Sequence, residues 1–149
     1  EACLLPLPFR LPLPMSHFTA IKTQIKDAAA LVKALADVGF KQVEVHETAH
    51  HLYGFQGDVR SQTAEVIIRR KYVGNASNDI GFQRQADGTF EAIVSEYDRR
   101  RYSQPWLNQV TQRYGYHALM ATAPAQGFTV EEEEVLADGT IRVVVGRWT

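Results

Sequence analysis

The stretch DAAALVKALADVGF, residues 27–40, carries the clearest local structural signal in the chain. Its apolar side chains recur on one helical face: Leu31, Val32, Leu35 and Val38. Asp27 can accept hydrogen bonds from the free amides of the first turn, and Gly39 favours the backbone conformation that ends a helix. The stretch therefore predicts an amphipathic helix that begins after Asp27 and ends before Gly39.

Extended segments are expected on both sides of this helix. Residues 17–25 carry a short mixed apolar pattern that predicts a strand ending near Lys26. Phe40, Val43 and Val45 resume extended structure after the helix. Beyond the glycines at positions 54 and 57, residues 64–68 predict another strand.

The tetrapeptide Ala-Asp-Gly-Thr occurs at residues 86–89 and again at residues 137–140. Asp-Gly readily takes the positive φ angles of a tight turn, so each copy predicts a hairpin. The first joins residues 80–84 with 90–97, and the second joins 129–135 with 141–148. We also expect Gly57, Gly81 and Gly127 at strand bends or turns.

A second helix is predicted between the two hairpins. Pro105 suits its first turn, and one apolar stripe follows: Trp106, Leu107, Val110, Tyr114 and Ala118. We expect the final hairpin to cover this stripe, with Tyr114 and Trp148 packed between the helix and the sheet. The pattern as a whole predicts an α+β fold, a single domain with a largely antiparallel sheet and two helices packed on one face.

Composition sets the outer limits on this domain. The chain has 149 residues, enough for one sizeable core but short for two domains. Four of its six prolines fall within residues 1–14, which we expect to be a disordered proline-rich tail or an upstream extension, so that the α+β domain spans residues 15–149. No apolar run approaches the roughly 20 residues of a spanning helix, so no membrane span is expected.

Charge and cysteine content narrow the class of protein further. The chain has 16 basic and 17 acidic residues, so no overall field attracts nucleic acid or anionic lipid. The single cysteine, Cys3, excludes an intramolecular disulfide and favours a reducing, cytoplasmic compartment. Because no phosphate-binding loop, dinucleotide fingerprint or nucleophile elbow occurs, no cofactor is expected.

The sequence His46-Glu47-Thr48-Ala49-His50, followed by His51, matches the zinc-peptidase pattern His-Glu-x-x-His. In such enzymes a helix places both histidines on zinc, and the glutamate acts as the base. The candidates are His46, His50 and His51 as metal ligands and Glu47 as a catalytic residue. Val43 and Val45 alternate like a strand just before the motif, which favours a polar loop over a zinc helix.

Two basic runs each end in a tyrosine. Arg69-Arg70-Lys71-Tyr72 is interpreted as the end of a strand at the solvent edge, where charge discourages aggregation. Arg99, Arg100 and Arg101, before Tyr102, make the better anion site, although a solvated loop also explains them. Such runs can bind phosphates and stack on bases.

Two further features carry charge or a titratable group. Glu131–Glu134 lie on a predicted strand, where alternate side chains point to opposite faces and cannot converge on one metal. They indicate a solvated edge strand or an acidic docking surface. His117 is a candidate general base beside Tyr114 or Tyr116, or a histidine satisfied by hydrogen bonds next to the core.

A series of short motifs occurs in order along the chain: Met15-Ser16-His17-Phe18, Gly54-Phe55-Gln56-Gly57, Asp79-Ile80-Gly81-Phe82, Gln112-Arg113-Tyr114-Gly115-Tyr116, Gln126-Gly127-Phe128, and Asp138-Gly139 followed by Arg147-Trp148. Together they resemble the hypothetical chloroplast frame thirty-five family, a domain of unknown function in cyanobacteria and algal plastids. The resemblance covers nearly everything after Met15. It implies a cytoplasmic or stromal protein of a photosynthetic lineage, without an assigned activity.

The chain departs from the family pattern in its tail and in the histidine cluster, which falls where the family varies. That departure weakens the zinc hypothesis. The run Arg99–Arg101 also lies in a variable stretch, so the resemblance gives nucleic-acid binding no support.

Three functions follow from these features. The leading hypothesis is a non-enzymatic binding or adaptor module with a protein partner. Its candidate contact residues are Tyr53, Phe55, Arg99, Arg100, Arg101 and Tyr116. The alternatives are a small metal-dependent hydrolase using His46, Glu47 and His50, and nucleic-acid binding through the arginine-rich loops, which the balanced charge disfavours.

Overall fold

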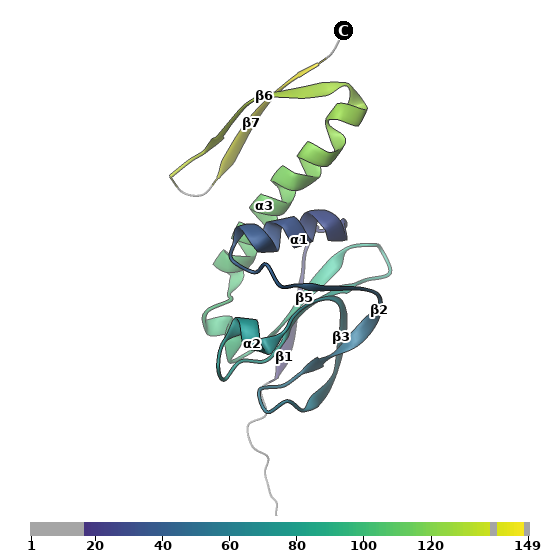
Figure 1. Ribbon diagram of the computed structural model, residues 1–149, viewed down its shortest axis with the longest axis vertical. Coiled ribbons are helices and arrows are strands. Elements are labelled where there is room, and N and C mark those ends of the chain that lie inside the picture. Colours follow the sequence, from purple (N-terminus) through teal and green to yellow (C-terminus); the bar gives the residue numbers. More distant parts are fainter. Residues whose placement is uncertain (1–16, 138–139, 148–149) are drawn as a thin grey trace, which may run out of the picture.

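Antiparallel strands form the framework of the molecule (Figure 1). The computed structural model describes residues 17–137 and 140–147. Five strands make one sheet in the order β1-β5-β4-β3-β2: β1 (Phe18–Lys22), β2 (Glu44–Tyr53), β3 (Val59–Ile68), β4 (Ile80–Arg84) and β5 (Phe90–Ser95). Every pairing within it is antiparallel, as the sequence predicts. The β4–β5 hairpin closes at the expected turn, where Gly88 has a φ of 89°.

Two long helices cover one face of this sheet. Helix α1 (Ala28–Asp37) begins where expected, because the Asp27 side chain accepts a hydrogen bond from the amide of Ala29 at 2.9 Å. It ends just before Gly39, whose φ of 109° suits glycine. Helix α3 (Gln104–Thr122) is the second predicted helix, with Pro105 in its first turn. Three short helices were not predicted: α2 (Arg70–Val73), η3 (Asp98–Arg100) and η4 (Pro124–Gln126).

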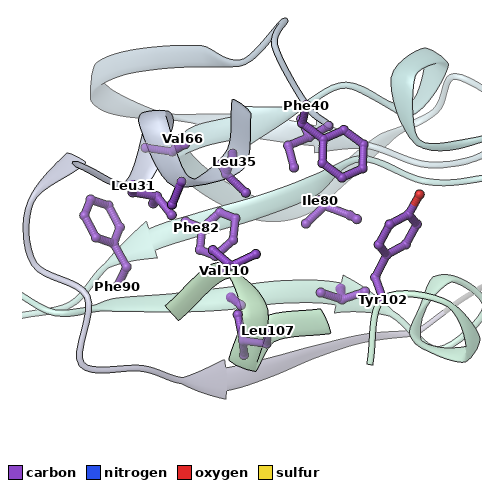
Figure 2. Close-up of a cluster of buried hydrophobic side chains, with 14 of the residues drawn as sticks. Leu31, Leu35, Phe40, Val66, Ile80, Phe82, Phe90, Tyr102, Leu107 and Val110 are labelled. Atoms are coloured by element: carbon purple, nitrogen blue, oxygen red, sulfur yellow. The ribbon is translucent and has the colours of Figure 1, made fainter. Parts of the chain in front are cut away.

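The main core lies between α1, α3 and the sheet. Figure 2 shows Phe82 at the middle of this cluster, with Leu35 of α1 and Val110 of α3 beside it. All three side chains are completely buried. At one end the rings of Phe40, Tyr102 and Trp106 meet edge-on or tilted, with centroids 5.2–6.1 Å apart. Aromatic pairs of this geometry add to the free energy of burial.

The opposite face of the sheet carries a smaller apolar cluster. Leu52, Ala64, Ile67 and Ile93 are buried there, with Phe18 packed against them. Gly81 of β4 lies beneath Leu52 and Ala64, so that an added Cβ would meet the Ala64 Cβ at 2.7 Å. The missing side chain at Gly81 therefore allows the β2–β3 hairpin to close over this face.

The final hairpin is where the expected packing is wrong. Strands β6 (Phe128–Val135) and β7 (Ile141–Arg147) pair only with each other and form a separate two-stranded sheet. Figure 1 shows this hairpin alongside the far half of α3, away from the five-stranded sheet. The apolar stripe of α3 instead packs against α1 and the main sheet. The two buried residues of the stripe, Leu107 and Val110, lie in the first half of α3, which is the half that packs against the main core. The final hairpin follows the other end of the helix.

Several predictions fall on residues outside the described ranges. They concern the proline-rich segment 1–14, Cys3, the turn at Asp138-Gly139 and the packing of Trp148. Of the helices in residues 17–137 and 140–147, none is both long enough and apolar enough to cross a membrane.

Two glycine-to-alanine changes should shift stability in opposite directions. Gly81→Ala should lower the free energy of unfolding by about 1–3 kcal/mol, because its methyl group overpacks the contact with Ala64 and Leu52. Gly115→Ala, within α3 and open to solvent, should raise it by about 0.5–1 kcal/mol, since alanine loses less backbone entropy in a helix. Urea unfolding measures both. A Gly81→Ala protein as stable as the parent would show that β2 and β3 do not close over β4.

Candidate binding cleft

A buried carboxylate organises the surface between β2, β3 and α2. The side chain of Asp79 is fully buried just before β4. Its Oδ1 accepts a hydrogen bond from the Arg70 amide at 2.6 Å, and its Oδ2 accepts from the Tyr53 amide at 2.7 Å and from Arg69 Nη1 at 2.8 Å. A buried charge is tolerated only with such partners, so Asp79 fixes the end of β2 against the start of α2.

Arg69 links this buried carboxylate to a second one at the surface. Its Nε and Nη2 donate to the two carboxylate oxygens of Glu44 at 2.9 and 2.8 Å, a bidentate pair. Its guanidinium also lies over the Tyr53 ring, 5.0 Å from the centroid. The hydrogen bonds between Arg69 and Glu44 lower the pKa of Glu44 from 4.5 to about 2. The same bonds raise the pKa of the Arg69 guanidinium above its ordinary value.

The expectation that residues 69–72 end a strand at the solvent edge is wrong. Strand β3 ends at Ile68, and Arg70–Val73 turn into the short helix α2. Arg69 is hydrogen-bonded to Asp79 and Glu44, while the side chains of Arg70 and Lys71 line a cleft without a carboxylate partner among the described residues. Local sequence could not reveal this, because both carboxylates come from other segments of the chain.

The cleft has a volume of about 700 Å³. Its lining comes from the residues before and within β2, the β2–β3 turn, α2 and the loop after it: Gln42, Val43, Glu44, Tyr53, Gly57, Arg69, Arg70, Lys71, Tyr72, Gly74, Asn75 and Asp79. Tyr53 and Tyr72 are 38% and 44% exposed. Arg70 donates to the Phe55 carbonyl at 2.9 Å, which leaves further donors of its guanidinium for a ligand. Of the predicted contact residues, Tyr53 lines this cleft and Phe55 borders it.

The histidine motif does not lie on the helix that zinc peptidases require, and the loop expected in its place is also wrong. His46, Glu47, His50 and His51 all belong to β2. A register shift between Val45 and His50 lets the rings of His46 and His50 stack with centroids 3.7 Å apart. His46 bonds Glu44 at 2.9 Å, and His51 bonds the Arg60 carbonyl at 2.8 Å. Within the described residues, no group of three or more potential ligands is placed to hold a metal ion.

The other titratable candidate, His117, is bound to a carboxylate. Its Nε2 lies 2.6 Å from Asp37 Oδ2, an oxygen that also accepts from Arg113 at 2.7 Å. Tyr114 points elsewhere, because its hydroxyl accepts from the amides of Lys26 and Asp27, at 3.0 Å each. These contacts tie α3 to α1 and to the segment before it.

Tyr116 connects α3 to the acidic strand. Its hydroxyl donates to Glu133 at 2.9 Å, and its ring meets that of His117 edge-on. Glu131–Glu134 are all exposed on β6, which agrees with both the edge-strand and the docking-surface interpretations, and Arg142 donates to Glu134 at 3.0 Å across the hairpin.

The remaining predicted contact residues lie on η3 and directly after it. Arg99 and Arg100 form its second and third positions, Arg101 follows, and all three are exposed. Arg100 donates to the Tyr97 carbonyl at 3.2 Å and lies over the Tyr97 ring. Sequence reasoning missed Asp79, Glu44 and Asn75 as site residues. The sequence contains one signal for Asp79, which is the first residue of the family motif Asp79-Ile80-Gly81-Phe82.

Comparison with known proteins finds relatives but no assigned activity. A family described as "Protein of unknown function (DUF1257)" matches residues 34–144. An uncharacterized protein ycf35 of Cyanophora paradoxa is 32% identical over 136 residues, covering 90% of this chain and 98% of the relative. The ycf35 protein of Guillardia theta is 31% identical over 139 residues, with the same coverage of both chains. No solved structure matches significantly.

The ion pair between Glu44 and Arg69 should make the free energy of unfolding depend on pH in the acid range. Folding lowers the pKa of Glu44 from 4.5 to about 2, so the stabilisation is complete above pH 4.5 and is lost as the pH falls toward 2. Glu44→Gln should therefore flatten the decline in the urea midpoint over that interval. Glu96→Gln, at an exposed glutamate away from the cleft, is the control. The pairing is refuted if both variants follow the parent's acid profile.

Proposed function

The chain belongs to the DUF1257 family, whose ycf35 relatives are uncharacterised, and we propose that it is a non-enzymatic binding module that captures an anionic group in the Tyr53–Tyr72 cleft. The observation that carries the proposal is the charge of Arg70 and Lys71. Neither side chain forms a salt bridge with any carboxylate of the described residues, although both line the cleft.

The geometry supports capture of phosphate or carboxylate. Arg69 is paired with both Glu44 and Asp79. Arg70 and Lys71 have no carboxylate partner in the part of the chain that the structure describes, and the cations lining the cleft outnumber its carboxylates by three to two. Arg70 presents a planar fork of donors that matches either anion, and its bond to the Phe55 carbonyl holds it in place. The cleft's volume of about 700 Å³ is within the range of ligand sites.

The carboxylates of the cleft are poorly suited to acid–base catalysis. An effective general base has a pKa near the working pH, whereas Glu44 has a pKa of about 2. Asp79 is fully buried and accepts three hydrogen bonds from the protein itself. Binding without chemistry therefore fits these groups better than hydrolysis does.

The module's setting remains a prediction. The proposal keeps the expectation of a cytoplasmic protein, stromal in plastid relatives, that acts by recruiting a partner. The anionic group can belong to a phosphate-bearing ligand or to an acidic segment of a protein.

Calorimetric titration with two probes tests the proposal. Tripolyphosphate supplies phosphate, and a short polyglutamate peptide supplies carboxylate. The parent should bind at least one probe, and the Arg70→Ala/Lys71→Ala double variant should bind it at least about tenfold more weakly, because both free cations of the cleft are gone.

The matched control is Lys22→Ala/Lys33→Ala, which removes the same charge from two exposed lysines outside the cleft. This control should bind like the parent. The proposal fails if neither probe binds the parent, or if the two double variants lose affinity equally.

A further inference from the structure

A second hollow adjoins the cleft. It has a volume of about 450 Å³ and shares Gly74 and Asn75 with the cleft's lining. Its other walls come from the loop after Asn75 and from the η3 region: Ala76, Ser77, Tyr97, Asp98, Arg100, Arg101 and Tyr102. Residues of the two basic runs, which are distant in the sequence, therefore line neighbouring hollows on either side of the loop at Gly74 and Asn75.

Buried hydrogen bonds join the chain segments that line the two hollows. Asp98 Oδ2 accepts from the Asn78 amide and from Ser95 Oγ, each at 2.9 Å. The hydroxyl of Tyr102 donates to the Val73 carbonyl at 3.3 Å, which joins the end of the second basic run to the end of α2. Asn78, Ser95 and Asp98 are buried, so this attachment is sheltered from water. The juxtaposition is thus a fixed property of the fold.

Two cations on this surface lie over exposed aromatic rings. Lys71 lies over the Tyr72 ring at 5.0 Å, and Arg100 lies over the Tyr97 ring at 4.3 Å. Tyr72 and Tyr97 are 44% and 43% exposed, although large aromatic side chains usually gain by burial. The cation–π contact in each pair favours keeping the tyrosine ring at the surface beside its cation.

Cations outnumber carboxylates in the lining of the two hollows, by five (Arg69, Arg70, Lys71, Arg100 and Arg101) to three (Glu44, Asp79 and Asp98). Among the residues that the structure describes, none of the cations Arg70, Lys71, Arg99, Arg100 and Arg101 forms a salt bridge. The balanced charge of the whole chain hides this local excess, since acidic residues such as Glu131–Glu134 lie on the separate β6–β7 hairpin.

We propose that the two hollows form one groove that binds single-stranded nucleic acid. This inference rests on the proposed function of the cleft and names its ligand. Arg70 and Lys71 on one side of Asn75, and Arg100 and Arg101 on the other, contact successive phosphates. Bases stack on the faces of the Tyr72 and Tyr97 rings that Lys71 and Arg100 leave open, and this combination of cations and aromatic rings is typical of proteins that bind single strands. An acidic peptide would use the cations but would make no stacking contact with the exposed rings.

The test uses a labelled oligothymidylate of about 15 nucleotides, which is within the site sizes of single-strand binding proteins. Fluorescence anisotropy at about 50 mM salt should show binding by the parent that weakens as salt rises. Arg100→Ala/Arg101→Ala should lower the affinity at least about tenfold. It should also reduce the slope of log affinity against log salt by about 1.4, for two lost phosphate contacts.

A further variant separates stacking from charge. Tyr97→Leu keeps every cation of the groove, so it should weaken binding about fivefold or more while leaving the salt slope unchanged. Phe128→Leu is the matched control: it removes another aromatic ring that lies under an arginine, here Arg147, but outside both hollows, and it should bind like the parent. Thermal unfolding of each variant establishes that its fold is intact.

The outcomes distinguish this inference from the proposed function. Polyglutamate or tripolyphosphate binding that depends on Arg70 and Lys71, without oligothymidylate binding, would overturn the inference and leave the cleft's function standing. Equal affinity for duplex DNA would overturn it too, because stacking requires unpaired bases. Oligothymidylate binding that is insensitive to Arg100→Ala/Arg101→Ala would contradict the single groove.

Discussion

The buried carboxylate of Asp79 is the interaction on which the candidate site depends. It accepts hydrogen bonds from the backbones of Tyr53 and Arg70 and from the side chain of Arg69, so one residue joins β2 to the start of α2. Its neighbour Asn78 accepts from the Phe55 amide and donates its own amide to Asp98. Asn78 and Asp79, adjacent residues just before β4, therefore connect the segments that line both hollows to the sheet.

Much of the fold could be predicted because its signals are local. Asp27 and Gly39 mark the ends of α1 through backbone geometry that depends on neighbouring residues alone. The Asp-Gly turn at residues 86–89 sets the β4–β5 hairpin in the same way. The antiparallel α+β class follows from these elements, and the family resemblance, carried by short motifs, is confirmed by the comparisons.

The site could not be predicted because it is made by distant parts of the chain. Glu44, Arg69 and Asp79 meet only after β2, β3 and β4 have paired, and nothing within their own segments indicates the ion pairs. The same holds for the final hairpin, whose separation from the main sheet is decided by how far α3 extends beyond α1. The His46-Glu47-x-x-His50 match failed as a helix for a related reason, since pairing with β3 makes the segment a strand.

Amide hydrogen exchange in an Asp79→Asn variant tests the central claim most directly. Asparagine keeps the size of the side chain but offers one acceptor oxygen, and its amide group turns a donor toward other donors. The amides of Tyr53 and Arg70 should lose protection together, while the amides that pair β4 with β5 keep theirs. If Tyr53 and Arg70 exchange at the parent's rates in the variant, Asp79 does not hold the cleft together.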